Sequence, residues 1–213
     1  MITPVLFDYY RSSASYRVRI ALNLKSVSYH AVPIDLSVGA QKEPDFSARN
    51  PQGFVPMLEE GGRRITQSLA IIDYLETTRP EPPLLPREPA DRAHVLALAL
   101  TIACDIHPLN NLRVLKHLVG PLGQADQVKE EWIARWISDG FSALEALAGA
   151  QAGRFLFGDS PGLADICLVP QMYNARRFGV SLDRYPLLVR ADAAAVAHPA
   201  FAAAHPDRVA RLA

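Results

Sequence analysis

The stretch VLFDYYRSSASYRVRIALNL, residues 5–24, decides the fold class because it passes from a strand through a polar turn into a helix. Residues 5–10 combine apolar and aromatic side chains that favour a β-strand. Residues 11–15 are polar and rich in serine, which is typical of a turn. Between Tyr16 and Leu24 the apolar residues recur at helical spacing. We therefore expect a strand that leads directly into a helix, as in the first half of a βαβ unit.

The residues that follow continue the alternation of strands and helices. A second strand is expected over residues 29–36, and a short helix over residues 41–49. A Gly-Gly pair at 61–62 separates two β-prone runs and predicts a hairpin. The last helix is expected over residues 68–78, with Ser68 as its N-cap. The resulting order, βαβαββα, predicts an α/β domain in which a small mixed sheet carries helices on its faces.

The composition changes near residue 80, because five of the ten residues from 80 to 89 are proline. Such a run forms neither a helix nor a central strand. We interpret residues 81–90 as a linker between the α/β domain, residues 1–80, and an all-helical domain, residues 91–213.

Apolar residues at helical spacing run through most of the second domain. The helical segments that we expect there are 91–119, 126–147, 163–178, 187–196 and 199–204. Pro108 and Pro170 are expected to break the first and the third of these segments. The domain is therefore predicted to be a helical bundle.

The charge balance excludes some classes of function. The 22 basic and 22 acidic residues of the 213-residue chain cancel, whereas a nucleic-acid binder normally carries a basic excess. No apolar run reaches the roughly 18 residues that span a bilayer, and the N-terminus shows no signal pattern. We expect no nucleic-acid partner, no membrane partner and a cytoplasmic location.

Cysteine and histidine placement argues against redox and metal chemistry. Cys104 and Cys167 are the two cysteines, which is too few for a disulfide framework or a four-cysteine metal site. Neither lies in the first domain, so a thioredoxin-type disulfide exchanger would lack its reagent. His107 has no second histidine at ligand spacing, and we therefore expect no metal.

Two expected helix starts in the first domain carry hydroxyl side chains. Ser12, Ser13 and Ser15 lie in the turn after the first strand, where unpaired N–H groups and the positive end of a helix stabilise an anion. Ser68, preceded by Gln67, opens the last helix of the domain in the same way. In both places plain N-capping explains the serines equally well, and the sequence leaves the two interpretations open.

Residues 12–22, SSASYRVRIAL, resemble the signature of zeta-class glutathione transferases, which usually reads Ser-Ser-Cys-x-aromatic-Arg-Val-Arg-Ile-Ala-Leu. The resemblance covers nearly the whole chain. It continues through Asn50-Pro51, Val55-Pro56, Gln67-Ser68, 105–111, 157–171, Arg177-Phe178 and Tyr185-Pro186. It implies a thioredoxin-like domain followed by an all-helical domain, usually assembled as a homodimer.

The resemblance also implies an activity. Members of this family include maleylacetoacetate isomerases and maleylpyruvate isomerases, so we expect a glutathione-dependent cis–trans isomerase that converts a maleyl dicarboxylate to its fumaryl isomer. Glutathione would be the cofactor, because its sulfur adds to the double bond and is later released. The substrate would be a small dicarboxylate.

Residue roles follow from the resemblance position by position. Ser12 matches the hydroxyl that binds the glutathione sulfur and, with Arg11 and Arg177, is expected to be catalytic. Arg11, Arg113 and Arg177 are expected to bind the acidic substrate. The residues expected to bind glutathione are Ser12, Ser13, Ala14, Ser15, Gln41, Val55, a cis Pro56, Gln67, Ser68, His107 and Asn111.

One departure from the family pattern leaves the reaction open. Ala14 replaces the signature cysteine, which is one reason why the chain looks closer to the maleylpyruvate type. The alternative enzyme would conjugate glutathione to small electrophiles or remove halide from them. A non-catalytic interaction module of the same fold is a further alternative, although it should lack Ser12 or the Gln67-Ser68 pair.

Overall fold

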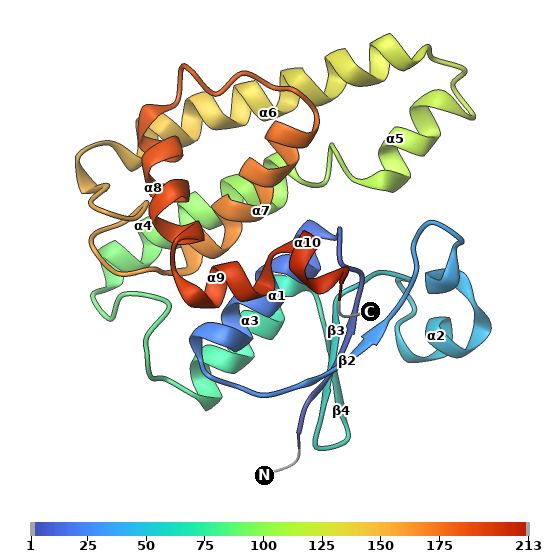
Figure 1. Ribbon diagram of the computed structural model, residues 1–213, viewed down its shortest axis with the longest axis horizontal. Helices are drawn as coiled ribbons and strands as arrows, with labels where there is room; N and C mark the ends of the chain where they lie inside the picture. Colours follow the sequence, from blue (N-terminus) through green and yellow to red (C-terminus); the bar gives the residue numbers. More distant parts are fainter. Residues whose placement is uncertain (1–2, 212–213) are drawn as a thin grey trace. The chain divides into compact units, whose positions relative to one another are not determined.

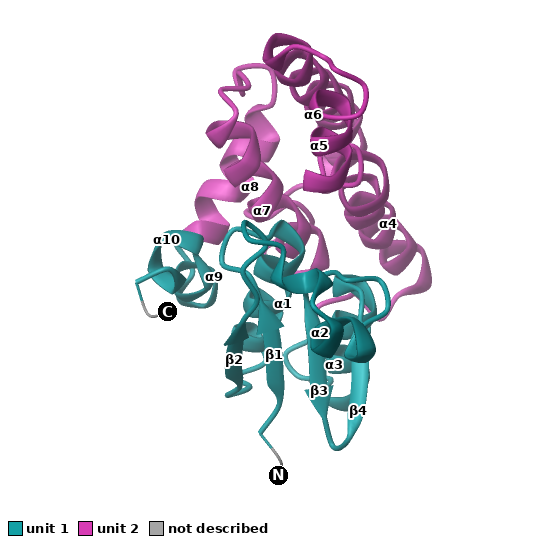
Figure 2. Cartoon of the chain, turned by 90° about the vertical axis from the view of Figure 1, so that its right-hand side faces the viewer, with its two compact units in different colours: residues 1–83, 197–213 teal, residues 84–196 magenta. Residues whose placement is uncertain are grey.

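The computed structural model describes residues 3–211, which form two compact units (Figure 2). One unit joins the residues up to Pro83 with those from Ala197 onward, and the other runs from Leu84 to Val196. The first boundary falls inside the proline-rich stretch. The second boundary differs from the division expected from the sequence, because it assigns the last part of the chain to the first unit.

The first unit has the βαβαββα order predicted from the sequence. Its elements are β1 (Val5–Asp8), α1 (Ser13–Leu24), β2 (His30–Pro33), the 3-10 turn η1 (Ala40–Lys42), α2 (Pro44–Arg49), β3 (Met57–Glu60), β4 (Arg63–Thr66) and α3 (Ser68–Thr78). The second strand is shorter than expected, since only four of its residues pair with β1.

The four strands form one mixed sheet in the order β2-β1-β3-β4. β1 is parallel to β2 and antiparallel to β3, and β3 pairs antiparallel with β4. The β3–β4 hairpin turns at Gly61 and Gly62, whose φ angles are 57° and 77°. Two consecutive positive φ angles are what a tight two-residue hairpin requires, and they favour glycine.

Alternate residues of β1 face different layers of the unit, as the pleat of a strand requires. Phe7 packs with Phe46 of α2 and Met57 of β3 on one face of the sheet. Asp8 points to the other face, where it contacts Arg19 of α1. There α1 and α3 pack against each other (Figure 1). The sheet therefore lies between α2 and the α1–α3 pair.

The helical unit contains α4 (Pro89–Leu100), the π-helical turn η2 (Thr101–Ile106), α5 (Leu112–Val119), α6 (Asp126–Ala148), the 3-10 turn η3 (Gly149–Gln151), α7 (Leu163–Arg177) and α8 (Pro186–Val196). The break predicted at Pro108 is confirmed, because the chain leaves the helix between η2 and α5. Next to η2, α6 passes at Gly140, where a Cβ would stand 2.2 Å from Cγ1 of Ile106. Only glycine permits this approach.

The break predicted at Pro170 is wrong, because α7 continues through the proline. α7 packs against both α4 and α8, and its buried residues lie on both sides of Pro170. Packing along the whole helix therefore outweighs the missing N–H of one proline.

Two short helices close the first unit instead of extending the bundle. α9 (Pro199–Ala204) packs along α1, and α10 (Pro206–Val209) follows it (Figure 1). Phe201 and Ala204 of α9 are fully buried. This placement differs from the expected one and gives α1 a second helical neighbour beside α3. None of the described helices is both long and apolar enough to cross a bilayer.

Candidate active site

One edge of the sheet is the side where β1 and β4 end and β3 begins. The chain segments that carry the predicted glutathione-binding residues of the first unit meet at this edge. Met57, the first residue of β3, pairs with both Phe7 near the end of β1 and Thr66 at the end of β4. Segment 9–12 therefore leaves the sheet, segment 50–56 enters it, and the start of α3 follows it at the same edge. Sheet topology alone brings together residues that are far apart in sequence.

Ser12 is the N-cap of α1, with extended backbone angles of −68° and 119°. Its N–H donates to the Tyr9 carbonyl at 2.9 Å, which closes the turn after β1. Its Oγ accepts a hydrogen bond from the N–H of Ser15 at 3.2 Å. That bond uses a lone pair of the oxygen, so the hydroxyl proton stays available for another acceptor.

Residues 13–15 form the first turn of α1 beside Ser12. Ser13 and Ser15 are buried, and Ala14 is half-buried. The Ser15 Oγ has no hydrogen-bond partner among residues 3–211. A buried hydroxyl without a partner is uncommon, and a bound polar ligand or water would satisfy it.

The loop before β3 presents the Val55–Pro56 peptide, which is cis as the resemblance implied. The Nδ2 of Asn50 donates to the Phe54 carbonyl at 2.7 Å and holds the loop together. Gln41 of η1 lies beside this loop, because its carbonyl oxygen is 3.1 Å from where a Cβ of Gly53 would stand. The Gln41 Oε1 is buried and has no partner in the described part of the chain.

α3 covers the predicted residues 68–78, but its N-cap is not the predicted one. Gln67 is the N-cap, with an unusual positive φ of 69°, and Ser68 is the first helical residue. The prediction that Ser68 caps the helix is therefore wrong, and no side chain caps it. The Oγ of the buried Ser68 instead accepts from Nη1 of Arg17 at 3.5 Å, and Nε2 of Gln67 donates to Oε1 of Gln52 at 2.7 Å.

The predicted residues of the helical unit cluster around the turn between η2 and α5. His107 follows η2 directly and is half-buried. Asn111 is the N-cap of α5, and its Oδ1 accepts from the N–H of Arg113 at 3.2 Å. Nε1 of Trp132 donates to the Leu109 carbonyl at 2.9 Å and so fixes this turn against α6.

Two of the predicted substrate-binding arginines share one arrangement. The guanidinium of Arg11 lies over the Tyr10 ring at 5.1 Å, and that of Arg177 lies over the Phe178 ring at 4.7 Å. Both are exposed, and neither forms an ion pair within residues 3–211. Arg176 differs, because it forms an ion pair with the buried carboxylate of Asp192.

Sequence reasoning missed two buried arginines of α1. Arg17 and Arg19 are 2% and 1% exposed. Arg17 reaches Ser68, and Arg19 binds Asp8. A signal was present, since two cations alternate with Val18 and Ile20 in a helix whose neighbours are apolar.

The edge of the sheet is rich in hydrogen-bond donors and in hydroxyls. It combines the Ser12 hydroxyl, the N–H groups at the starts of α1 and α3, and the backbone of Val55, which lies just outside the β3 ladder. Such a set suits an extended peptide-like ligand that carries carboxylates and a thiol. In the described residues no group of three His, Cys, Asp or Glu side chains could hold a metal ion.

Comparisons with known proteins cover both units. The family model for the N-terminal domain of glutathione S-transferase matches residues 6–83, and the model for the C-terminal domain matches residues 130–210. Maleylacetoacetate isomerase of Rhizobium meliloti is 50% identical over 205 residues, which are 96% of each chain.

Solved structures agree with the sequence relatives. One of them is maleylacetoacetate isomerase from Methylobacterium extorquens AM1, solved with malonate and glutathione bound. It is 42% identical to this chain, with a TM-score of 0.93 over 96% of this chain and 97% of that one. Maleyl pyruvate isomerase, described as a bacterial zeta-class glutathione S-transferase, is 44% identical, with a TM-score of 0.94 over the same shares of the two chains.

Proposed function

The chain belongs to the zeta class of the glutathione S-transferase family, and from this membership we propose that it is a glutathione-dependent cis–trans isomerase of a maleyl dicarboxylate. The observation that carries the proposal is the Ser12 hydroxyl at the start of α1, with its proton left available. The proposal extends to the roles of individual residues, to the assembly and to the location in the cell.

Glutathione is bound at the edge of the sheet. The backbone of Val55 pairs with its cysteinyl part, and Gln67 and Ser68 hold its γ-glutamyl end at the positive end of α3. The first turn of α1, Ser13 to Ser15, surrounds the sulfur. Gln41, His107 and Asn111 supply the further contacts that the family resemblance implies, and the buried Gln41 Oε1 supports its part because it needs a donor.

Ser12 lowers the pKa of the bound thiol. A free thiol has a pKa of about 8.5, so only a small fraction is thiolate at neutral pH. A hydrogen bond to a charged group contributes roughly 1.5–3 kcal/mol, and about 1.4 kcal/mol corresponds to one pKa unit. The Ser12 O–H, together with the α1 N-terminus, therefore lowers the thiol pKa by about one to two units.

The arginines act on the substrate. When bound, glutathione supplies the thiolate that adds to one alkene carbon of the cis substrate, and its release after rotation about the new single bond leaves the trans, fumaryl product. Arg11, Arg113 and Arg177 bind carboxylates, for which a guanidinium offers two parallel N–H donors. A guanidinium beside the conjugated carbonyl also stabilises the negative charge that develops there, and we assign this catalytic role to Arg11 and Arg177.

The assembly and the location follow the family. We assign a homodimer, in keeping with the family resemblance, and a cytoplasmic location, in keeping with the sparse use of cysteine. We propose maleylpyruvate over maleylacetoacetate because three features look closer to that type: Ala14 in place of the signature cysteine, the stretch 104–108, and arginines at all three of 11, 113 and 177.

A direct assay tests the proposal. Purified protein is mixed with maleylpyruvate or maleylacetoacetate, with and without glutathione, and loss of the maleyl compound and formation of the fumaryl compound are followed. We expect conversion only with glutathione, with no net consumption of glutathione. Stoichiometric consumption of glutathione, or faster turnover of a haloacid or haloaromatic compound, would instead identify a conjugating or dehalogenating transferase.

A further inference from the structure

Arg19 is a buried cation in the middle of α1, the helix that Ser12 caps. Its side chain is 1% exposed, and the ring of Tyr16 lies 5.3 Å from its guanidinium carbon. A charge so far from water persists in a folded protein when its N–H donors are paired. The partners of Arg19 therefore show which parts of the unit it joins.

Two of these partners lie just before Ser12 in the chain. Nη1 donates to both carboxylate oxygens of Asp8, at 2.7 and 2.9 Å. Nη2 donates to the carbonyl of Tyr10 at 3.0 Å. Asp8 is the last residue of β1, and Tyr10 lies inside the turn that connects β1 to α1. Arg19 thus holds the end of the strand and the turn against the body of the helix.

The Ser12 oxygen lies in the same turn as Tyr10, one of the partners of Arg19. Ser12 is held on one side by its own bond to the Tyr9 carbonyl and on the other by the bond from Ser15. Tyr9 stands between Asp8 and Tyr10, the two residues that Arg19 binds. A shift of either residue would therefore move the turn and the hydroxyl with it.

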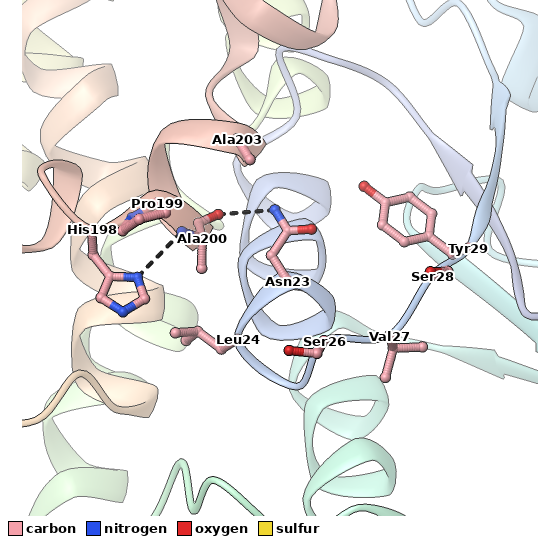
Figure 3. A pocket seen from close by; sticks show the side chains of 10 residues that line it. All are labelled: Asn23, Leu24, Ser26, Val27, Ser28, Tyr29, His198, Pro199, Ala200 and Ala203. Carbon is pink, nitrogen blue, oxygen red and sulfur yellow. Dashed lines mark hydrogen bonds between the residues drawn. The ribbon is translucent and has the colours of Figure 1, made fainter.

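The third partner belongs to the C-terminal segment. Nε of Arg19 donates to the carbonyl of Ala204 at 3.1 Å, and Nδ2 of Asn23 donates to the carbonyl of Ala200 at 2.9 Å. Figure 3 shows the second of these bonds beside His198. Arg19 and Asn23 are one turn apart on α1, as Ala200 and Ala204 are on α9, so two tethers hold the helices side by side.

The position of Ala204 favours this arrangement. It is the last residue of α9, where carbonyls lack helical partners and a cation is stabilised by the helix dipole. The Arg19–Asp8 pair is shielded from water, since its two side chains are 1% and 5% exposed. The C-terminal segment therefore completes the surroundings in which Arg19 binds Asp8 and Tyr10.

We propose that Arg19 is a positioning residue for the isomerisation. Its bonds to Asp8 and Tyr10 hold the Ser12 hydroxyl in place, and its bond to the Ala204 carbonyl of α9 holds the guanidinium from a third side. The inference rests on the proposed function, because this hydroxyl is the one assigned to the sulfur of glutathione. It gives the C-terminal segment a part in activating the thiol without contact with the thiol.

The test compares Arg19→Lys with Lys25→Met. Lysine keeps the charge, but its three N–H donors all leave one nitrogen and do not match the three partners that the separate guanidinium nitrogens reach. Lys25 is the matched control, because it is a buried cation of the same helix region, bound to Glu76 and to the Pro82 carbonyl at 2.6 Å each, and does not touch the turn.

Two readouts separate positioning from stability. The first is activity at the sulfur, measured as kcat and as the pH dependence of thiolate absorbance in the glutathione complex. The second is hydrogen exchange of the Ser15 amide, whose bond to Ser12 depends on the turn. For Arg19→Lys we expect kcat to fall about ten- to a hundredfold, thiol ionisation to move to higher pH and the Ser15 amide to exchange faster. Lys25→Met should lower the melting temperature and leave both readouts unchanged.

The outcomes distinguish this inference from the proposed function. Wild-type ionisation and exchange in folded Arg19→Lys would overturn the inference, as would equal changes in Lys25→Met. If the wild-type protein does not ionise bound glutathione, the proposed function fails, and the exchange comparison alone decides whether Arg19 holds the turn. Should Arg19→Lys not fold, Asp8→Asn keeps one acceptor for the guanidinium and should show the same changes at smaller size.

Discussion

The N–H of Ser15 donates to the side-chain oxygen of Ser12 at 3.2 Å, so the hydroxyl caps α1 and still keeps its proton. The sequence leaves capping and thiol activation open as alternatives, but the two use different parts of one hydroxyl. The cap uses a lone pair, and activation uses the O–H. Ser12 can therefore serve the stability of the helix and the chemistry at once.

Substitutions at Ser12 separate the two roles. Ser12→Ala removes the hydroxyl and the cap, whereas Ser12→Gly removes the hydroxyl and costs the helix only a few tenths of a kcal/mol. We expect both variants to lose roughly eight- to twenty-fivefold of kcat near pH 7, because the thiol pKa rises by about one to two units to its free value of about 8.5. The loss should shrink above pH 9, where the thiol ionises unaided.

The measurement is kcat against pH for the wild type and both variants. Ser28→Ala, an exposed serine of the same unit, is the control and should match the wild type. If Ser12→Gly kept full activity at pH 7, the hydroxyl would matter only as a cap and the activation argument would be wrong.

Arg176 and Arg177 are adjacent, yet the structure gives them different partners. We therefore expect substitution of Arg177 to change KM and substitution of Arg176 to change stability. Arg177 has no ion pair within residues 3–211, so Arg177→Gln should leave the melting temperature unchanged. Loss of a charge-assisted bond to a carboxylate should raise the KM for the dicarboxylate about tenfold or more, and loss of the cation assigned to the developing negative charge should also lower kcat.

Arg176→Gln should lower the melting temperature and leave KM unchanged. Burial raises the pKa of Asp192, and the Arg176 guanidinium counteracts this, so the variant leaves a buried carboxyl without its cation. Because the Arg176 side chain is half exposed, we expect a cost of only about 1 kcal/mol, or a fall of roughly 2–4 °C in Tm, with KM unchanged. A raised KM in Arg176→Gln and not in Arg177→Gln would exchange the two roles.

Local patterns predicted much of the fold. The Gly-Gly hairpin at 61–62 and the helix over 68–78 stand where the sequence placed them, whereas β1 ends at Asp8 and α1 begins at Ser13, both earlier than the expected residues 10 and 16. Each is specified by neighbouring residues, through apolar spacing or through the φ angles that glycine tolerates. These elements also set the edge of the sheet at which the predicted glutathione-binding residues of the first unit meet.

The features that the sequence did not predict depend on distant contacts. Arg19 finds Asp8 across a turn and Ala204 across most of the chain, and no local pattern marks such partners. The helix through Pro170 persists because α4 and α8 pack along it. The N-cap of α3 is Gln67 and not Ser68, whose hydroxyl contacts Arg17 instead of capping the helix. In each case tertiary contacts outweighed local preference.

Gln67 carries backbone strain at the site. A glycine there should relieve the strain but remove the side chain that we assign to glutathione. Its φ of 69° with ψ of 120° suits glycine better than glutamine. We expect Gln67→Gly to be as stable as the wild type or up to about 1 kcal/mol more stable, while glutathione binds at least tenfold more weakly because the side chain assigned to its γ-glutamyl end is gone.

A matched control exists at the other non-glycine residue with positive φ in the described chain. Ser26 has a φ of 54° and lies outside the predicted site, so Ser26→Gly should relieve strain without changing glutathione affinity. Calorimetric titration with glutathione and urea unfolding measure the two quantities. Equal affinity in Gln67→Gly and wild type would remove Gln67 from the binding residues.

Asp165 predicts a pH dependence of stability in the helical unit. Its Oδ1 accepts from the N–H of Leu156 at 2.8 Å, and its Oδ2 accepts from the N–H of Gly162 at 3.0 Å, at the start of α7. Burial raises its pKa from 3.8 to about 6, although the backbone N–H groups counteract this. Between these two values the folded state binds more protons than the unfolded state.

Asp165 therefore makes the free energy of unfolding larger at low pH than at neutral pH. The contribution of Asp165 to the free energy of unfolding is largest below about pH 4 and falls as pH rises to about 6, by roughly 3 kcal/mol for a shift of about two pKa units. Asp165→Asn cannot titrate, but it gives up one of the two capping bonds. It should therefore be less stable than the wild type at pH 4, with the gap narrowing towards pH 6–7.

Urea unfolding at pH 4, 5, 6 and 7 measures this gap. Asp159→Asn is the control, because the Oδ1 of this exposed carboxylate accepts from the N–H of Arg154 at 2.9 Å in the loop before α7. Both variants remove one carboxylate, so the comparison of Asp165→Asn with Asp159→Asn cancels the general effect of a lost charge, since other titrating groups change both proteins alike. A constant gap between Asp165→Asn and the wild type would mean that the Asp165 carboxyl keeps the same pKa on unfolding, and that its hydrogen bonds at the start of α7 fully offset its burial.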